Sequence, residues 1–397
     1  MANPYCCYAL AFALALALYS LRWSALYPRL SWALVIFLIV TIALHFLGGI
    51  RFAKRGVASF YKLMPTTFRL APVLIKVCLY ALWILEFIYQ GGIPLLLILF
   101  KHPFDYRQFG IPTLHVLIVT FGSFYTVFLF HQWLSNRSRL ILILYMANLA
   151  AAILIYNRGM FLFNLSSSIF LFLMYKNKIT VRHLAIGAIG TVVIFYLFGV
   201  MGNLRVTNEA HKSYSPDDFL DTGQATASFR NSFVPPEFFW AYIYSTSPLA
   251  NLEENIRSNS PDSITWVTFP RWFNSEVLWD FISKRLNAAA GVTPEAVATV
   301  PGPFNATTVY AGSFAYLGFA GLALMAIVIL AIPLLYVRIL PPASPFFLTG
   351  LAILNTIFLF MIFDNTIRFS GVSFQIVYPI LLHHSMRRIP LVKQAFL

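Results

Sequence analysis

The sequence predicts an all-α membrane protein with about ten transmembrane helices and one large, mostly helical loop on the far side. Three observations predict this fold class. Of the 397 residues, 59% are hydrophobic and only 11% are charged, whereas about a quarter of the residues in soluble domains are charged. Apolar runs close to the ~20 residues that span a bilayer recur along the chain. The basic residues are also distributed unevenly between the segments that join these runs, which sets orientation.

Ten apolar runs are predicted to be membrane-spanning helices. They cover residues 5–21, 31–50, 73–92, 112–133, 139–156, 160–175, 184–202, 312–336, 345–363 and 372–386. The first run has no basic region before it, so we interpret it as an anchor and not as a cleaved signal. The chain then divides into residues 1–202 with seven spans, a large loop at 203–311, and residues 312–397 with three spans and a tail.

The charges predict that both ends of the chain lie in the cytoplasm. With the N-terminus placed there, fifteen of the 28 Lys and Arg residues fall in cytoplasmic segments, and none of the 14 Asp and Glu residues does. Eleven of the acids lie between Glu209 and Glu295, in the loop on the far side. The net charge of +14 is therefore an orientation signal facing anionic lipid, and there is no soluble basic domain to bind nucleic acid.

The loop at 203–311 is predicted to fold into a packed, mostly helical cap. Its composition is rich in aromatic residues and disfavours disorder, and long ordered loops are usually functional. Four segments have the pattern of a helix start, in which a capping residue or a proline precedes the first turn. They begin at Ser215, Pro236, Ser247 and Thr293.

Glu86 is the first candidate for chemistry. It lies about five residues inside the outer end of its predicted span, or ~7–8 Å deep. An acid at that depth costs a few kcal/mol unless it is paired or protonated, so it is a functional candidate. A structural partnership with an Arg or a Tyr is an equally good interpretation. Gly91 and Gly92, followed by Pro94, are expected to end or break the helix there.

Arginines form a second set of candidates at the outer membrane boundary. Outside turns are normally poor in arginine, and the guanidinium group matches phosphate oxygens in a bidentate way, so a bound diphosphate would explain the set. The alternative is contact with lipid headgroups together with local ion pairs, such as Asp364 with Arg368. The candidate arginines are Arg107, Arg158, Arg205 and Arg368.

Polar aromatic residues in the loop suggest a sugar-binding cleft. Aromatic faces cover the apolar side of a sugar ring, while nearby amides and carboxylates bind its hydroxyls. The alternative is that the aromatic residues form the core of the loop and that the acids lie on a solvated helix face. The residues concerned are Trp240, Tyr242, Tyr244 and Asn251, followed by Glu253 and Glu254.

The histidines and the three cysteines show no spacing typical of a metal site, so no metal or other cofactor is expected.

Several short motifs together resemble the Wzy-type polymerases of O-antigen and capsule repeat units, over most of their length. The motifs keep the family order, with the long outside loop between spans 7 and 8. One departure is Tyr316 and Leu317, where the family often has an acid shortly before a Gly-x-x-Gly motif. The motifs are Glu86…Gly91-Gly-Ile-Pro94, Asp105-Tyr-Arg-Gln-Phe-Gly110, Asn157-Arg-Gly159, Tyr244-Ser-Thr-Ser-Pro-Leu-Ala-Asn251 and Phe304-Asn-Ala-Thr-Thr308…Gly318-Phe-Ala-Gly321.

The resemblance implies a metal-independent glycosyltransferase with a GT-C-like architecture in the bacterial inner membrane. It would join oligosaccharide repeats carried on undecaprenyl diphosphate at the periplasmic face. Donor and acceptor would both be lipid-linked, and a chain-length regulator protein is a further implied partner. In this interpretation the four arginines hold the leaving diphosphate. Glu86, or else Glu253 or Glu254, is the base for the acceptor hydroxyl.

Two other functions remain open from the sequence. An O-antigen ligase that transfers polymer to the lipid A core would share the fold, the donor and the arginines. A transporter or flippase for the same lipids would place charged residues along the interior across the whole bilayer. Here the charges collect at one membrane face, which favours the enzyme.

Overall fold

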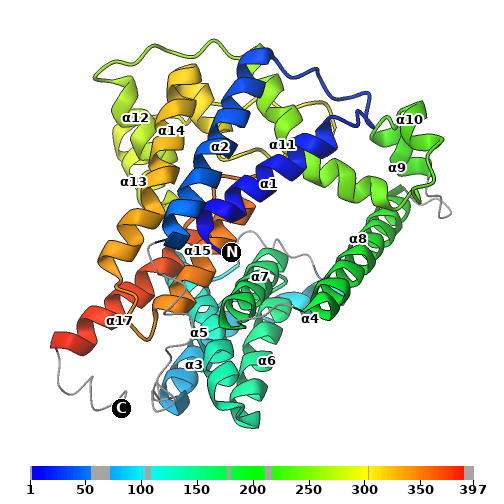
Figure 1. The fold of residues 1–397 in the computed structure, drawn as a ribbon. Coiled ribbons are helices and arrows are strands. Elements are labelled where there is room, and N and C mark those ends of the chain that lie inside the picture. The colour runs from blue at the N-terminus through cyan, green and yellow to red at the C-terminus, as the bar shows by residue number, and fades with distance from the viewer. Residues whose placement is uncertain are drawn as a thin grey trace.

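The computed structural model describes residues 2–54, 72–100, 102, 109–176, 180–210, 217–302 and 304–388. These residues form helices joined by turns and by longer segments such as residues 291–310, and the only β-type pairing among them is an isolated bridge between Ser24 and Ala225 (Figure 1). The helices are α1 Pro4–Tyr19, α2 Trp32–Lys54, α3 Pro72–Gln90, α4 Pro94–Leu99, α5 Leu114–Asn136, α6 Arg139–Leu154, α7 Arg158–Tyr175, α8 Val181–Ala210, α9 Asp217–Thr222, α10 Ala227–Arg230, α11 Phe238–Ser258, α12 Thr268–Glu276, α13 Asp280–Ala290, α14 Ala311–Ile339, α15 Phe347–Phe360, α16 Ser370–Ser373, the 3₁₀ helix η3 Phe374–Ile376 and α17 Val377–Arg388.

Six of the described helices are long and apolar enough to cross a membrane, which agrees with an all-α membrane protein. They lie at Trp32–Lys54, Ile75–Leu99, Leu114–Asn136, Arg158–Tyr175, Val181–Asn203 and Ala311–Ile339. Three more helices, α1, α6 and α15, are apolar but shorter. The tenth predicted run, at 372–386, is divided between α16, η3 and α17. Helices therefore coincide with all ten predicted runs, while ten crossings of a membrane remain a prediction.

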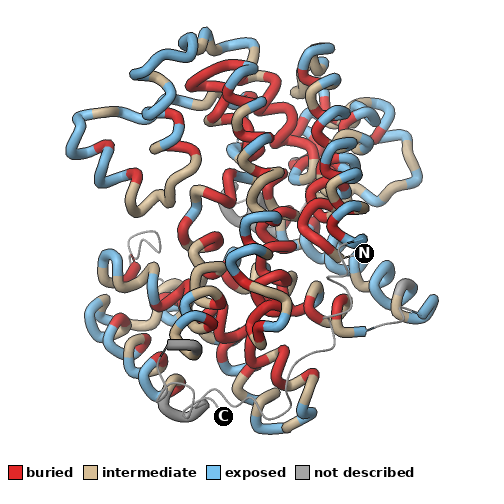
Figure 2. Tube along the Cα trace, turned by 60° about the vertical axis from the view of Figure 1, so that its left-hand side comes forward, coloured by how far each residue is buried: buried red, intermediate tan, exposed pale blue. Residues whose placement is uncertain are grey.

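The core of the bundle lies where α15 packs against α1, α5 and α7. The hydroxyl groups of Ser167 and Thr356 are 2.8 Å apart, and the rings of Phe163 and Phe360 are 4.6 Å apart. Helices α7 and α15 therefore run antiparallel. Figure 2 shows the buried residues concentrated along the middle of the molecule. This packing places the start of α7 and the end of α15 at the same end of the bundle.

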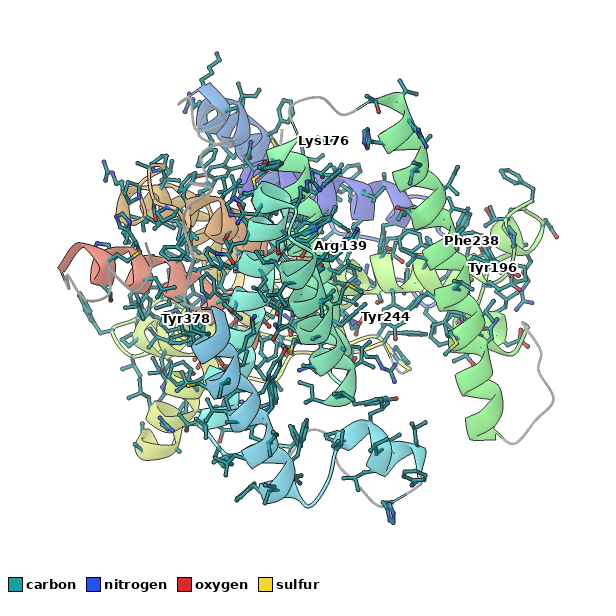
Figure 3. The ribbon with its side chains drawn as sticks, turned by 90° about the horizontal axis from the view of Figure 1, so that it is seen from below. Arg139, Lys176, Tyr196, Phe238, Tyr244 and Tyr378 are labelled. Carbon is teal, nitrogen blue, oxygen red and sulfur yellow. The ribbon has the colours of Figure 1, made fainter. Side chains whose placement is uncertain are left out.

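The large loop is attached to α8 through glycines that allow close contact. A Cβ atom on Gly199 would lie 2.0 Å from the backbone oxygen of Glu237, and one on Gly202 would lie 2.5 Å from the Trp240 ring. Around this contact the rings of Tyr196 and Phe238 are 6.0 Å apart, at the junction of α8 and α11 (Figure 3). The side chains on much of α8 are otherwise exposed, as expected for a helix that faces lipid.

Two of the four predicted helix starts in the loop are confirmed and two are wrong. Helix α9 begins at Asp217 and α11 at Phe238, as predicted. Pro248 lies inside α11 and does not start a helix. Residues 293–300 are not helical. The physical reason is tertiary, because the amides of Asn251 and Asn255 on α11 accept from the backbone N–H groups of Val300 and Ala298.

Candidate functional site

The candidate site lies at the end of the bundle where α5 and α7 begin and α15 ends. Chain connections and packing bring these three helix ends together with α16, which contacts α5, α7 and α15. Helices α12 and α13 of the large loop also reach this end, because the N–H of Asp280 at the start of α13 donates to the carbonyl of Arg368 at 2.9 Å. Loop and bundle therefore meet at the candidate site.

Glu86 is fully buried and is bound by the start of α5. Its carboxylate accepts a hydrogen bond from the N–H of Ile111 at 3.2 Å and lies 2.9 Å from Nδ1 of His115. The His115 side chain is 24% exposed, and its Nε2 atom has no hydrogen-bond partner within the described ranges. A buried carboxylate that holds one imidazole nitrogen of a partly exposed histidine is the arrangement that orients a general base.

The helix break after α3 lies close in the sequence to Glu86, and a glycine lies against its partner His115. Helix α3 ends at Gln90, Gly91 has a φ of 76°, and Pro94 begins α4. The expectation that Gly91, Gly92 and Pro94 interrupt the helix is thus confirmed. Gly110, with a φ of 96°, lies against the His115 ring, and a Cβ atom there would be 2.5 Å from it. A glycine is therefore required where the chain enters α5.

Arg368 forms a second cluster with a buried acid of the loop. Its Nη1 atom donates to the Glu276 carboxylate at 3.1 Å and to the carbonyl of Ser275 at 3.2 Å. Asn365 donates to the other carboxylate oxygen of Glu276 at 3.0 Å. The Arg368 side chain is 43% exposed, and its Nε and Nη2 atoms have no partner in the described part of the chain. Part of the guanidinium group is thus held in place, and the rest can bind an anion.

The ion pair between Asp364 and Arg368, named above as part of the alternative interpretation, is not formed. Such a pair needs helical spacing, and α15 ends at Phe360, so the segment that follows is not helical. Arg368 pairs with Glu276 instead.

Burial and hydrogen bonds together set the ionisation of two loop acids, Glu276 and Asp280. Burial raises the pKa of Glu276 from about 4.5 to about 7, and the charge of Arg368 and the hydrogen bond from Asn365 oppose this shift. Burial also tends to raise the pKa of Asp280, but hydrogen bonds from Ser370 and Lys284 outweigh it, so the pKa is lowered. Asp280 is therefore a fixed anion, whereas Glu276 exchanges its proton near neutral pH.

Helix α13 links the two clusters. At its start, Asp280 binds the backbone of Arg368 and Ser370. Five residues later, ~7–8 Å along the axis, Arg285 donates to the Thr113 hydroxyl at 2.6 Å. Thr113 precedes α5 and lies two residues before His115. A single short helix therefore binds the segment that carries Arg368 and the residue two positions before His115.

Arg158 is the other predicted arginine whose side chain is described. It opens α7, is exposed, and donates to the Tyr156 hydroxyl at 2.6 Å, with its guanidinium 5.0 Å from the centre of that ring. It lies at the same end of the bundle as Arg368, because α7 and α15 are antiparallel. Arg205 lies on α8, with its side chain outside the described part, and Arg107 lies outside the described residues.

Glu253 and Glu254 lie on α11 and make no hydrogen bond to the site residues described above. Glu253 is buried, and its carboxylate accepts from the N–H and hydroxyl of Ser31 at 2.8 and 2.9 Å and from Arg257 at 3.0 Å. Glu254 accepts a hydrogen bond from Ser258. One oxygen of Glu253 thus fastens α11 to the turn between α1 and α2, and the other pairs with Arg257 on the same helix.

The predicted sugar-binding residues occupy different environments. Trp240 is buried against Phe219, with ring centroids 3.4 Å apart, and Tyr242 is buried in the same cluster. Asn251 donates to the carbonyls of Phe304 and Ala306. Tyr244 is 43% exposed. Of these four side chains, Tyr244 has the surface to contact a ligand, while the contacts of the other three are those of a structural core.

Sequence reasoning did not single out Glu276, Arg285 or His115 as members of the site. Glu276 ends a short helix that also buries Trp272, and an acid beside a buried tryptophan was the available signal. His115 opens an apolar helix 29 residues after Glu86, and nothing in the sequence pairs them.

Within the described ranges, no three His, Cys, Asp or Glu residues form an arrangement that could hold a metal ion. Comparisons of the chain with protein family models, curated proteins and solved structures find no match.

Proposed function

We propose that this chain is a membrane glycosyltransferase that polymerises oligosaccharide repeats carried on undecaprenyl diphosphate at the outer face of a bacterial inner membrane. The observation that carries the proposal is the Glu86–His115 pair at the end of the bundle where Arg158 and Arg368 also lie. Ten membrane crossings and a GT-C-like arrangement belong to this proposal, and the helices at all ten predicted apolar runs support them.

In the proposed reaction, an acceptor hydroxyl attacks the anomeric carbon of the donor sugar. The bond from that carbon to the diphosphate oxygen breaks, and undecaprenyl diphosphate leaves with the bonding electrons. His115 takes the hydroxyl proton through Nε2, and Glu86 stabilises the imidazolium that results. Glu86 is then a positioning residue, and the base is its partner.

The arginines support departure of the diphosphate. Arg368 is anchored by Glu276, so it does not have to be ordered when the anion arrives. Arg158 lies at the start of α7, where the helix dipole also favours an anion. Exposed Tyr244 is the remaining candidate for sugar contact.

The test is turnover of purified full-length protein with undecaprenyl-diphosphate-linked repeats as the sole substrate. A ladder of polymer is expected from the unaltered chain. His115→Ala and Arg368→Gln are each expected to reduce the rate at least about a hundredfold. His384→Ala and Arg182→Gln, exposed residues on α17 and α8, serve as matched controls and are expected to leave it unchanged.

Other outcomes identify the alternatives. Product that forms only when a lipid A core acceptor is added would identify a ligase. Binding of the lipid-linked repeat without turnover would favour a transporter.

One observation favours the transporter: the amide of Asn164 is fully buried on α7, and neither of its polar atoms has a partner in the described part. Buried polar groups of this kind often line a transport path.

A further inference from the structure

A cavity of about 640 Å³ lies between the end of α1 and the start of α2. Arg22 and Arg29 contribute to its lining from the connecting turn, and Leu16, Leu30 and Val35 contribute apolar walls. Both arginines are exposed, and neither guanidinium group has a hydrogen-bond or ion-pair partner among the described residues. Two unpaired cations above apolar walls suit a ligand with an anionic head and an apolar tail.

Hydrogen bonds hold the backbone of the turn at Arg22 and Arg29, although they do not hold the guanidinium groups. The carbonyl of Arg22 accepts from the Thr226 hydroxyl at 3.1 Å, and the carbonyl of Arg29 accepts from the guanidinium of Arg257. Glu253 fastens the turn at Ser31 with two further hydrogen bonds. The backbone under both arginines is therefore held by the loop helices, which lowers the entropy cost of binding.

Backbone strain at Arg22 also supports a binding role for its side chain. Its φ is 51°, a left-handed conformation that costs about 1 kcal/mol for a residue with a side chain. Asparagine or glycine would fit this position without that cost. An arginine kept at a strained position of an exposed turn suggests that its side chain is needed there.

Exposed apolar side chains lie on both helices beyond the cavity, and those of α2 share the helix face of Trp32, which lines it. Leu14 and Leu10 follow along α1, and Ile36 and Ile39 follow along α2, all of them at least half exposed. Because the two helices meet at the turn, both sets run away from the arginines in the same direction. An acyl or prenyl chain could follow this surface while its head stays at the turn.

We infer that this cavity binds the phosphate head of a membrane lipid, with Arg22 and Arg29 as the phosphate ligands and α1 and α2 as the wall for its chain. The head that fits best is a phosphomonoester or diphosphate, since two guanidinium groups match two negative charges. The site is separate from Arg368 and does not depend on the reaction proposed above.

Native mass spectrometry of the full-length chain in a neutral detergent tests this inference. The probe is dioleoyl phosphatidic acid, compared with dioleoylglycerol, which lacks the phosphate, and inorganic phosphate, which lacks the chains. Phosphatidic acid is expected to bind with defined stoichiometry. Arg22→Asn and Arg29→Gln are each expected to weaken it about tenfold. Leu16→Trp, which fills the cavity and keeps both charges, is expected to block it.

Controls separate the site from loss of folding and from the other proposal. Arg271→Gln removes an exposed arginine of α12 that does not line the cavity, and it should leave binding unchanged. Arg22→Asn should not lower the unfolding temperature, because it relieves strain. Repeating the titration with Arg368→Gln removes the anion site of the proposed function. Any binding of phosphatidic acid by the Arg368→Gln protein that still depends on Arg22 and Arg29 is then binding at the cavity.

The inference is overturned if Arg22→Asn and Arg29→Gln bind phosphatidic acid as the unaltered chain does. Equal binding of dioleoylglycerol would show that the phosphate is not recognised and that the site is only an apolar groove. Displacement of the lipid by inorganic phosphate at the same concentration would identify a site for soluble phosphate.

Discussion

Glu276 is a buried acid that is paired with a partly exposed arginine. It is 2% exposed, and it holds Arg368, a residue with exposed donors left for an anion. The burial of Glu276 raises its pKa to about 7. The charge that anchors Arg368 therefore depends on pH near neutrality, because of this pair of side chains.

At the residue scale, the stability of the folded chain should fall as pH rises from about 4.5 to about 7, to the extent that Glu276 contributes. In this window the folded protein keeps a proton on Glu276 that the unfolded chain has released, so higher pH favours unfolding. Each pH unit between the two pKa values is worth about 1.4 kcal/mol, so the full effect is roughly 3 kcal/mol. The pH series of thermal unfolding in detergent measures it.

Glu276→Gln should flatten this dependence, because the amide does not titrate. Glu254→Gln is the matched control, since its carboxylate is partly exposed and bound only by Ser258 in the described part. The same slope in the Glu276→Gln protein as in the unaltered chain would contradict the prediction.

At the scale of single helices, the contact between α8 and α11 depends on the absence of side chains. Gly199 lies against the backbone oxygen of Glu237, which cannot move aside as a side chain could. Gly187 and Gly190 lie on the same helix with nothing within 4 Å of an added Cβ atom. One helix therefore contains glycines of two kinds, those needed for packing and those that are not.

Gly199→Ala is expected to lower the free energy of unfolding by about 1–3 kcal/mol, because an added methyl group overpacks the contact. Gly187→Ala should raise it by about 0.5–1 kcal/mol, because alanine favours the helix. Unfolding temperatures of the two detergent-solubilised proteins should therefore shift in opposite directions. A gain in stability from Gly199→Ala would show that α11 is not seated against α8 in this way.

For the whole molecule, the open question is how the helices cross the membrane. Placing the N-terminus in the cytoplasm puts all eleven acids between Glu209 and Glu295 on the far side. The segment between α7 and α8 is then cytoplasmic. Ser263 and Thr180 are exposed positions in these two regions.

Single cysteines test this orientation, after replacement of Cys6, Cys7 and Cys78 by alanine. A membrane-impermeant maleimide applied to spheroplasts should label Ser263→Cys at once. Thr180→Cys should be labelled only after the membrane is opened. The reverse pattern would overturn the orientation inferred from the basic residues.

The structure places the predicted site residues in different surroundings, and the contacts of each residue show why. Glu86 was predicted from its depth in an apolar run, because an unpaired carboxylate there is costly whatever surrounds it. Its partner His115 was not predicted, since the contact depends on how the chain re-enters after α4. Arg368 was predicted from its position outside a span, but Glu276 lies 92 residues away in the sequence. Glu253 binds Ser31, which lies 222 residues away.

By itself the sequence determined where the long apolar helices lie and that they suit a membrane. Those properties depend on contiguous residues, since the transfer of a helix into lipid is a sum over its own side chains. The tertiary structure decided which charged side chains bind other parts of the protein and which remain available to bind a ligand. That decision rests on contacts between distant segments, such as Arg368 with Glu276 and the turn of Arg22 and Arg29 with α11. Local pattern contains no information on such contacts.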